Sequence, residues 1–144
     1  MIKLLREKSC GAVVFIKKED QILYLLLNYA ARHWDFVKGN VEQGESEKQT
    51  VTRELKEETG IVATQPFEGF RERIQYFYRR RGETIQKEVV FYLIQVDTEK
   101  VELSFEHVGF AWLDYQHALE KLTFKNAKDV LQKAHAFLET KKII

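Results

Sequence analysis

The sequence from Gly39 to Ile61 reads GNVEQGESEKQTVTRELKEETGI. The first glycine is followed after five residues by Glu45, and after seven further residues by Arg53 and the segment RELKEETGI. Seven positions of fixed residue type, each about 6 to 7% frequent in ordinary proteins, coincide by chance on the order of once in 10⁸ starting points. We therefore expect this segment to decide both the fold and the chemistry.

The second half of the segment carries the signals of a helix. Ser46 and Gln49 stand at the spacing of a capping box, and Gly60 suits the left-handed residue that ends a helix. Val51 and Leu55 lie one turn apart, so they can anchor one face of the helix in a core. We therefore expect a helix between Ser46 and Gly60.

Three glutamates crowd one face of that helix. Glu54, Glu57 and Glu58 stand at i, i+3 and i+4, where each like-charge pair costs roughly 0.2 to 0.5 kcal/mol. A bound cation reverses this penalty, and carboxylate oxygens favour Mg²⁺ or Mn²⁺. Taken alone, the run RELKEETG is more typical of a solvated helix face. The upstream glycine and Glu45 argue against that interpretation, and we expect Arg53 to orient Glu45 beside the metal ligands.

The rest of the chain predicts strands on both sides of this helix and two helices at the end. Runs of apolar and β-branched residues bounded by turn residues predict strands over 9–16, 22–29, 67–78, 88–96, 101–103 and 108–113. The first two should form one hairpin and the next two a second. Residues 32–44 are expected to form a functional loop. Asp114 should cap a helix through Leu122, and an amphipathic helix should cover 127–138.

The composition limits the class of protein. The chain has 144 residues, 44% of them hydrophobic, and we expect one domain over residues 1–144. Its net charge of +1 favours neither a nucleic-acid nor a membrane partner. The N-terminal apolar run Gly11–Ile16 is too short for a signal peptide or a membrane span, so a cytoplasmic protein, taken as a monomer, is expected. Cys10, the only cysteine, excludes an internal disulfide and is expected to be buried.

The segment Gly39–Ile61 resembles the signature of the Nudix hydrolases without a mismatch. The resemblance implies an α/β/α sandwich, in which a mixed β-sheet is flanked by helices. It implies hydrolysis of a nucleoside diphosphate linked to another group, with divalent ions and a water that attacks phosphorus. It also implies that Glu54, Glu57 and Glu58 are metal ligands and that the backbone carbonyl of Lys38 adds another.

The flanks of the signature resemble one branch of that family, the asymmetrical diadenosine tetraphosphate hydrolases. The matching segments are His33–Trp34, Lys38–Glu42, Glu68–Phe70, Tyr76, Ser104–His107, Ala111–Leu113 and Phe124–Lys125. The branch commonly has a proline where this chain has Val37 and a histidine where it has Asn40. These departures predict a looser loop and a neutral amide in place of a titratable ring.

The branch implies roles for residues outside the signature. Glu106 becomes a further metal ligand or the general base. Tyr76 and Phe124 become a clamp for one adenine, because stacking on an aromatic ring is worth roughly 1 to 3 kcal/mol per base. The residues expected to contact phosphate are Lys38, Lys87 and His33. Residue type alone leaves other roles open: an exposed carboxylate, two core aromatics and solvated lysines.

One basic run, Arg79–Arg81, falls at the expected tip of the second hairpin. Such a run is typical of a solvated turn. The alternative is that it captures distal phosphates or the triphosphate end of an RNA.

The sequence supports three hypotheses about function. The first is an enzyme that converts diadenosine tetraphosphate and water to ATP and AMP. The second is a pyrophosphohydrolase that acts on RNA 5′ ends or on nucleoside triphosphates, which the arginine run favours. The third is a nucleotide-binding regulator that has the fold without turnover. Three crowded carboxylates argue against it, because a binding domain does not need them.

Overall fold

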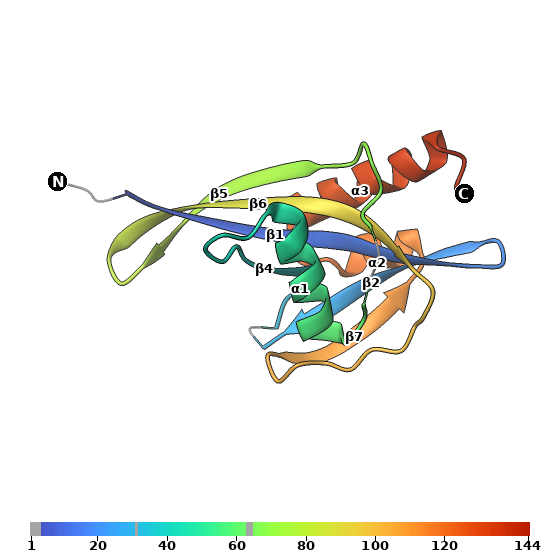
Figure 1. The fold of residues 1–144 in the computed structure, drawn as a ribbon, viewed down its shortest axis with the longest axis horizontal. Coiled ribbons are helices and arrows are strands. Elements are labelled where there is room, and N and C mark those ends of the chain that lie inside the picture. The colour runs from blue at the N-terminus through green and yellow to red at the C-terminus, as the bar shows by residue number, and fades with distance from the viewer. Residues whose placement is uncertain (1–3, 31, 63–64) are drawn as a thin grey trace.

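The computed structural model describes residues 4–30, 32–62 and 65–144. Its centre is formed by two long strands, β1 (Leu4–Lys18) and β6 (Glu83–Val96), which pair in parallel along almost their whole length (Figure 1). The other strands pair antiparallel: β2 (Gln21–Tyr29) and β4 (Val37–Asn40) with β1, β3 (Trp34–Asp35) and β7 (His107–Leu113) with β2, and β5 (Glu72–Arg80) with β6. The sheet is therefore mixed, as predicted.

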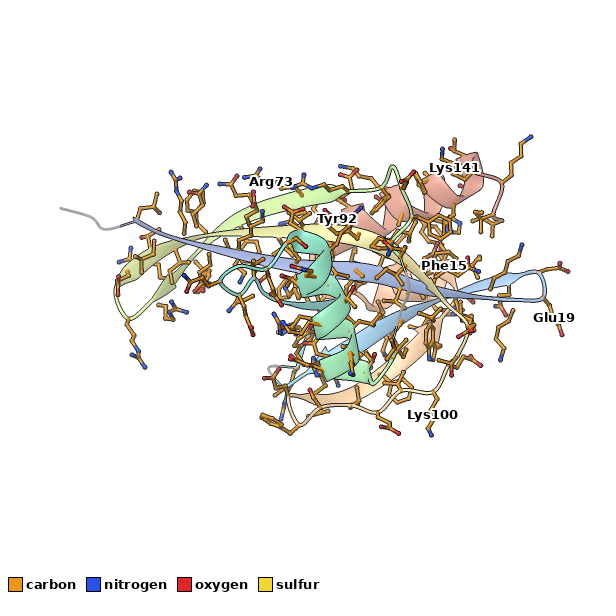
Figure 2. The ribbon with its side chains drawn as sticks, viewed as in Figure 1. Phe15, Glu19, Arg73, Tyr92, Lys100 and Lys141 are labelled. Atoms are coloured by element: carbon orange, nitrogen blue, oxygen red, sulfur yellow. The ribbon has the colours of Figure 1, made fainter. Side chains whose placement is uncertain are left out.

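Helices cover both faces of this sheet (Figure 1). Side chains alternate along β1, so that Val13 and Phe15 join a core cluster with α2 (Tyr115–Lys121) and α3 (Lys125–Thr140). Val14 points to the other face and joins a cluster with Val51 and Leu55 of α1 (Glu47–Thr59). Phe15, which is labelled in Figure 2, belongs to the first cluster. The predicted sandwich of helix, sheet and helix is confirmed.

Helix α1 begins and ends where its sequence predicts. Ser46 and Gln49 form both hydrogen bonds of a capping box, and Gly60 ends the helix with φ 77°. Val51 and Leu55 are fully buried against the sheet. The glutamates are therefore presented by a helix whose two ends and core face are all held in place.

Pairing between distant segments corrects the prediction in five places. Strand β1 covers Leu4–Lys18 instead of the expected 9–16, because residues before Ser9 also pair in parallel with β6. The expected loop 32–44 contains β3 and β4, because β4 finds a partner in residues 9–12 of β1. The expected strand 101–103 is absent, because the N–H of Glu102 donates to the carbonyl of Thr59 at the end of α1. Strand β5 starts at Glu72, later than expected. Strand β6 starts at Glu83, earlier than expected, because the hairpin turn is only Arg81–Gly82.

The remaining elements follow the sequence closely. Asp114 caps α2 by accepting a hydrogen bond from the N–H of His117. Helix α3 buries the predicted apolar stripe, including Val130, Leu131 and Leu138, and Cys10 is fully buried in β1. Within the described ranges, no helix combines the length and apolar character that a membrane span requires.

Candidate functional site

A cleft of about 520 Å³ lies between β4, α1 and the β5–β6 hairpin. Of the predicted site residues, those that line it are Lys38, Glu54, Glu58, Tyr76, Lys87 and Glu106. They come from β4, from α1, from the β5–β6 hairpin and from the turn before β7, which the fold brings together. The cleft thus combines carboxylates on one side with two lysines and an aromatic ring.

Glu58 is the most buried carboxylate of the cleft. Only 3% of the residue is exposed, and its Oε2 has no hydrogen-bond partner among the described residues. Burial, followed by the charges of Glu54 and Glu106, raises the pKa of Glu58 to about 9. A buried oxygen that lacks a partner and resists ionisation fits a site that gains a cation.

Glu54 lies beside the strand that carries Gly39. A Cβ atom added at Gly39 would approach the carboxylate of Glu54 closer than 3.0 Å, so only glycine leaves room for this side chain. Burial raises the pKa of Glu54, although the guanidinium of Arg53 opposes this by donating to Oε1 at 2.7 Å. The glycine of the signature therefore has a steric role in the site.

Arg53 connects the loop before α1 to the helix itself. Its Nε donates to Glu45 Oε2 at 2.6 Å and its Nη2 donates to Glu45 Oε1 at 3.0 Å, which is the predicted bidentate contact. Nη2 also donates to the carbonyl of Asn40 at 3.0 Å. The bond from Arg53 lowers the pKa of Glu45 to about 2. The loop and the helix are thereby held in one arrangement.

Glu57 does not line the cleft. Its side chain is 58% exposed and accepts from Arg53 Nη1 at 3.1 Å. Across the described ranges, no three Asp, Glu, His or Cys side chains are grouped closely enough to form a ready-made metal centre. The carboxylates that line the cleft belong to Glu42, Glu54, Glu58 and Glu106, and carboxylate oxygens suit a hard divalent ion.

A second hollow of about 290 Å³ adjoins the cleft and is largely apolar. Tyr76 and Phe124 both line it, together with Ile74, and Lys38 and Tyr76 line both hollows. Phe124 is 49% exposed, so it is not a core residue. His33 packs between Phe124 and Tyr29, stacked on the Tyr29 ring at 5.0 Å. The two predicted aromatics thus share one surface beside the carboxylates.

The two lysines are held by neighbouring polar groups. Lys38 Nζ lies 3.0 Å from Asp35 Oδ2, and Lys87 Nζ donates to Asn40 Oδ1 at 2.9 Å. Burial lowers the pKa of Lys87. Asn40 also accepts from Ser9 Oγ at 2.8 Å, so the amide has defined partners at this position. Both cations lie where they can face an anionic ligand.

Comparison with known proteins decides the family. The sequence pattern of the NUDIX domain matches residues 6–134. The chain belongs to the Nudix family. Among Nudix relatives, bis(5′-nucleosyl)-tetraphosphatase [asymmetrical] of Mus musculus is 38% identical over 143 residues, covering 91% of this chain and 95% of the relative. The protein of the same description from Caenorhabditis elegans is 33% identical over 136 residues, covering 91% and 96%.

Solved Nudix structures agree with this placement. The binary complex of a C. elegans Ap4A hydrolase superposes with a TM-score of 0.82 at 31% identity, covering 93% of this chain and 98% of that one. Dihydroneopterin triphosphate pyrophosphohydrolase of E. coli has a TM-score of 0.73 at 19% identity, which shows the shared fold alone.

The Nudix scaffold also contains residues that the sequence pattern did not single out. Tyr29 lines the carboxylate cleft and donates to the carbonyl of Phe36 at 2.7 Å. Asp35 is buried and pairs with Lys38, a relation that their i, i+3 spacing could have indicated. His107 is buried, and its Nε2 lies 3.5 Å from Glu58 Oε1. Tyr29 and His107 carry no local signal, because only the sheet brings them to α1.

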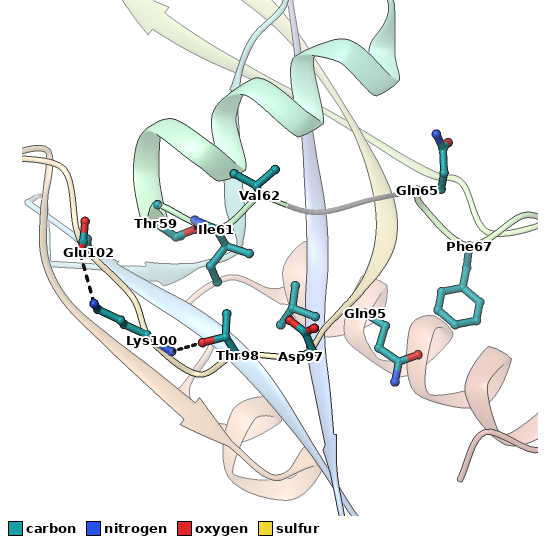
Figure 3. Close-up of a pocket in the computed structure, with 12 residues that line it drawn as sticks. Thr59, Ile61, Val62, Gln65, Phe67, Gln95, Asp97, Thr98, Lys100 and Glu102 are labelled. Atoms are coloured by element: carbon teal, nitrogen blue, oxygen red, sulfur yellow. Dashed lines mark hydrogen bonds and ion pairs between the residues drawn. The ribbon is translucent and has the colours of Figure 1, made fainter.

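A larger hollow of about 630 Å³ lies elsewhere in the molecule. Figure 3 shows it between the end of α1, around Thr59, and the segment 95–102, which comprises the end of β6 and the residues after it. None of the predicted site residues lines it. Its charged side chains are those of Asp97, Lys100 and Glu102, all exposed, and the last two pair with each other at 3.8 Å. The size of a hollow therefore does not identify the site of this Nudix enzyme; its chemistry does.

Proposed function

We propose that this Nudix enzyme hydrolyses dinucleoside tetraphosphates and converts diadenosine tetraphosphate and water to ATP and AMP. The observation that carries the proposal is the junction of two hollows, one with carboxylates and lysines and one between Tyr76 and Phe124. A polyphosphate with a purine at its end needs both surfaces side by side. The names of the relatives at 33 to 38% identity support the same substrate.

The proposal assigns divalent ions, Mg²⁺ or Mn²⁺, to the glutamates of the signature. Glu54 and Glu58 are the primary ligands, because they line the cleft and Glu58 Oε2 is buried without a partner. Glu57, Glu106 and the backbone carbonyl of Lys38 complete the proposed set, and Glu106 is an alternative general base. When bound, such ions stabilise charge on phosphate oxygens and lower the pKa of water.

The proposed roles of the other residues follow from their contacts. Lys38 and Lys87 neutralise phosphate charge by exchanging their present partners for phosphate oxygens. These partners are Asp35 for Lys38, and Asn40 and Glu7 for Lys87. His33 adds a hydrogen bond to phosphate. Arg53 and Glu45 are positioning residues, because they hold the loop and Glu54 without facing the substrate.

The reaction is tested by its products. Incubation of the protein with diadenosine tetraphosphate and Mg²⁺, followed by chromatography, should give ATP and AMP in equal amounts. Two ADP, or much faster cleavage of nucleoside triphosphates, would show that the substrate is wrong. Glu58→Gln should reduce turnover by about 100-fold because it removes a charge that holds the metal. Glu139→Gln, on the exposed face of α3, is the control and should leave turnover unchanged.

The clamp for the base is tested at Phe124. Phe124→Leu should raise KM about 5- to 150-fold, the equivalent of roughly 1 to 3 kcal/mol of stacking, with little change in kcat. Phe77→Leu is the matched control, since Phe77 is an exposed phenylalanine of β5 that lies outside both hollows. Equal KM values for the wild type and Phe124→Leu would exclude the clamp.

The arginine run gives little support to the RNA alternative. Arg80 lies 3.1 Å from Glu7, and Arg79 donates to the carbonyl of Gly82 at 3.2 Å, so both side chains are engaged by the hairpin and β1. The finer parts of our proposal are Mg²⁺ or Mn²⁺ as the metal used, a monomeric state and a cytoplasmic location. Size-exclusion chromatography with light scattering tests the monomeric state.

A further inference from the structure

A buried histidine faces the carboxylate that the proposed function makes a metal ligand. The side chains of His107 and Glu58 are 0% and 4% exposed, and His107 Nε2 lies 3.5 Å from Glu58 Oε1. This is slightly longer than a hydrogen bond, and His107 Nε2 and Glu58 Oε2 both lack a hydrogen-bond partner among the described residues. Buried polar atoms of this kind normally have partners, so this pair calls for an explanation.

The imidazole ring of His107 is held on its other sides. Nδ1 lies 3.1 Å from Ser104 Oγ, and the ring packs edge-on against Tyr29 with centroids 4.5 Å apart. The backbone around it is also tied down, because the N–H of His107 donates to the carbonyl of Ser104 and the N–H of Ser104 donates to the carbonyl of Glu58, each at 3.3 Å. The ring therefore has a fixed orientation with Nε2 toward Glu58.

The protonation of the ring follows from the state of Glu58 that a metal requires. An ionised carboxylate can only accept hydrogen bonds, so Nε2 must carry the hydrogen and Nδ1 must accept one from the Ser104 hydroxyl. Assuming the proposed function, we infer that His107 is a positioning residue, whose Nε2–H holds Glu58 Oε1 and leaves Oε2 for the cation. Such support of a metal-binding carboxylate is generally worth 10- to 100-fold in metal affinity or activity.

The same histidine also determines where Glu106 lies. Glu106 is in the turn between Ser104 and His107, and it lines the cleft together with Glu54 and Glu58. Because the turn is anchored to α1 through Glu58 and to the buried imidazole, two carboxylates from distant parts of the chain keep a fixed relation. Loss of the imidazole should therefore disturb the positions of both Glu58 and Glu106.

The test compares two substitutions at His107. His107→Leu fills the space without a donor, whereas Gln in His107→Gln places an amide N–H near the position of Nε2. The measurements are Mn²⁺ binding by titration calorimetry, kcat and KM for diadenosine tetraphosphate, and the thermal midpoint in EDTA. We expect His107→Leu to bind Mn²⁺ about 10- to 100-fold more weakly with a similar loss in kcat, and His107→Gln to recover most of both.

Two outcomes would overturn the inference: wild-type Mn²⁺ affinity in His107→Leu, or equal loss in both variants at unchanged thermal midpoints. If His107→Leu does not fold, Ser104→Ala replaces it and should weaken Mn²⁺ binding several-fold, since it frees the ring to adopt the other tautomer. Unchanged Mn²⁺ binding in Ser104→Ala would then contradict the inference. A wild type that binds Mn²⁺ but does not cleave the dinucleotide rejects the proposed substrate alone.

Discussion

At the scale of single residues, close approach explains why glycine stands at the start of the signature. Gly39 does not need a positive φ, and its role is to leave space for the Glu54 carboxylate. Gly11, on the neighbouring strand β1, meets the backbone of β4 instead. Gly39 is therefore needed for the function of the site, whereas Gly11 is needed for the stability of the sheet.

Gly39→Ala should reduce activity with little effect on stability. The added methyl group would collide with the far end of a flexible side chain, so Glu54 swings away while the strand remains in place. We expect kcat to fall by about 100-fold, as for a displaced reacting group, and the thermal midpoint to change little.

A matched substitution controls for the added methyl group. A Cβ at Gly109 would meet Asn28 at ordinary contact distance, 3.7 Å, so Gly109→Ala should keep both activity and stability. Wild-type activity in Gly39→Ala would show that the Glu54 carboxylate need not occupy its present position.

At the scale of elements, the loop before α1 is joined to the helix by Arg53 and Glu45. Glu45 also accepts from the hydroxyl of Thr50 and the N–H of Glu42, so one carboxylate closes the loop onto the first turns of the helix. The arrangement resembles an extended helix cap. Because the Glu45 carboxylate can be protonated, the stability of this loop should depend on pH.

Glu45→Gln should reduce stability at pH 7 and lose that effect in acid. The folded-state pKa of Glu45 is about 2, below its ordinary value near 4.5, chiefly because Arg53 donates to it. A lowered pKa stabilises the folded state above the unfolded pKa, and this contribution is lost as the pH falls from about 4.5 toward 2. Thermal midpoints at pH 7, 5 and 3 should show the gap to wild type shrinking. A gap independent of pH, or the same trend in Glu139→Gln, would contradict this account.

At the scale of the whole molecule, the central pair β1 and β6 carries the site on its edges. Strand β4, with Lys38 and Gly39, pairs directly with residues 9–12 of β1, while Lys87 lies on β6. The core on both faces of the sheet thus determines how far the lysines lie from the carboxylates. A substitution inside the sheet should therefore change both the stability and the activity of the enzyme.

Gly11→Ala tests this dependence. A Cβ at Gly11 would clash with the backbone carbonyl of Val37 and lie 2.8 Å from Lys38 Cβ, which β4 can relieve only by moving. Overpacking of this kind costs about 1 to 3 kcal/mol. We expect a lower urea midpoint together with a raised KM, because Lys38 shifts with β4. Unchanged stability would mean that the β1–β4 contact is more tolerant than its geometry implies.

Local sequence was sufficient for α1 and its face of carboxylates. The capping box and the Gly60 stop depend on contacts within four residues, and the one-turn spacing of Val51 and Leu55 marks the face that packs on the sheet, so local sequence predicts all three features. The resemblance of the flanks extended this to Glu106, Tyr76 and Phe124. The structure places Glu106 in the carboxylate cleft and the two aromatics beside one hollow.

Only the tertiary structure decided which of the three crowded glutamates enter the cleft. Glu54 and Glu58 line it, whereas Glu57 turns toward solvent and Arg53, because the packing of α1 on the sheet determines its rotation. Tertiary contacts also decided that strand β4 forms by pairing with β1, that Asp35 pairs with Lys38, and that His107 lies beside Glu58. By itself the sequence determined the helix, its capping and its chemistry, since these arise between near neighbours. The distances between the site's parts depend on contacts across the sheet, which local patterns do not record.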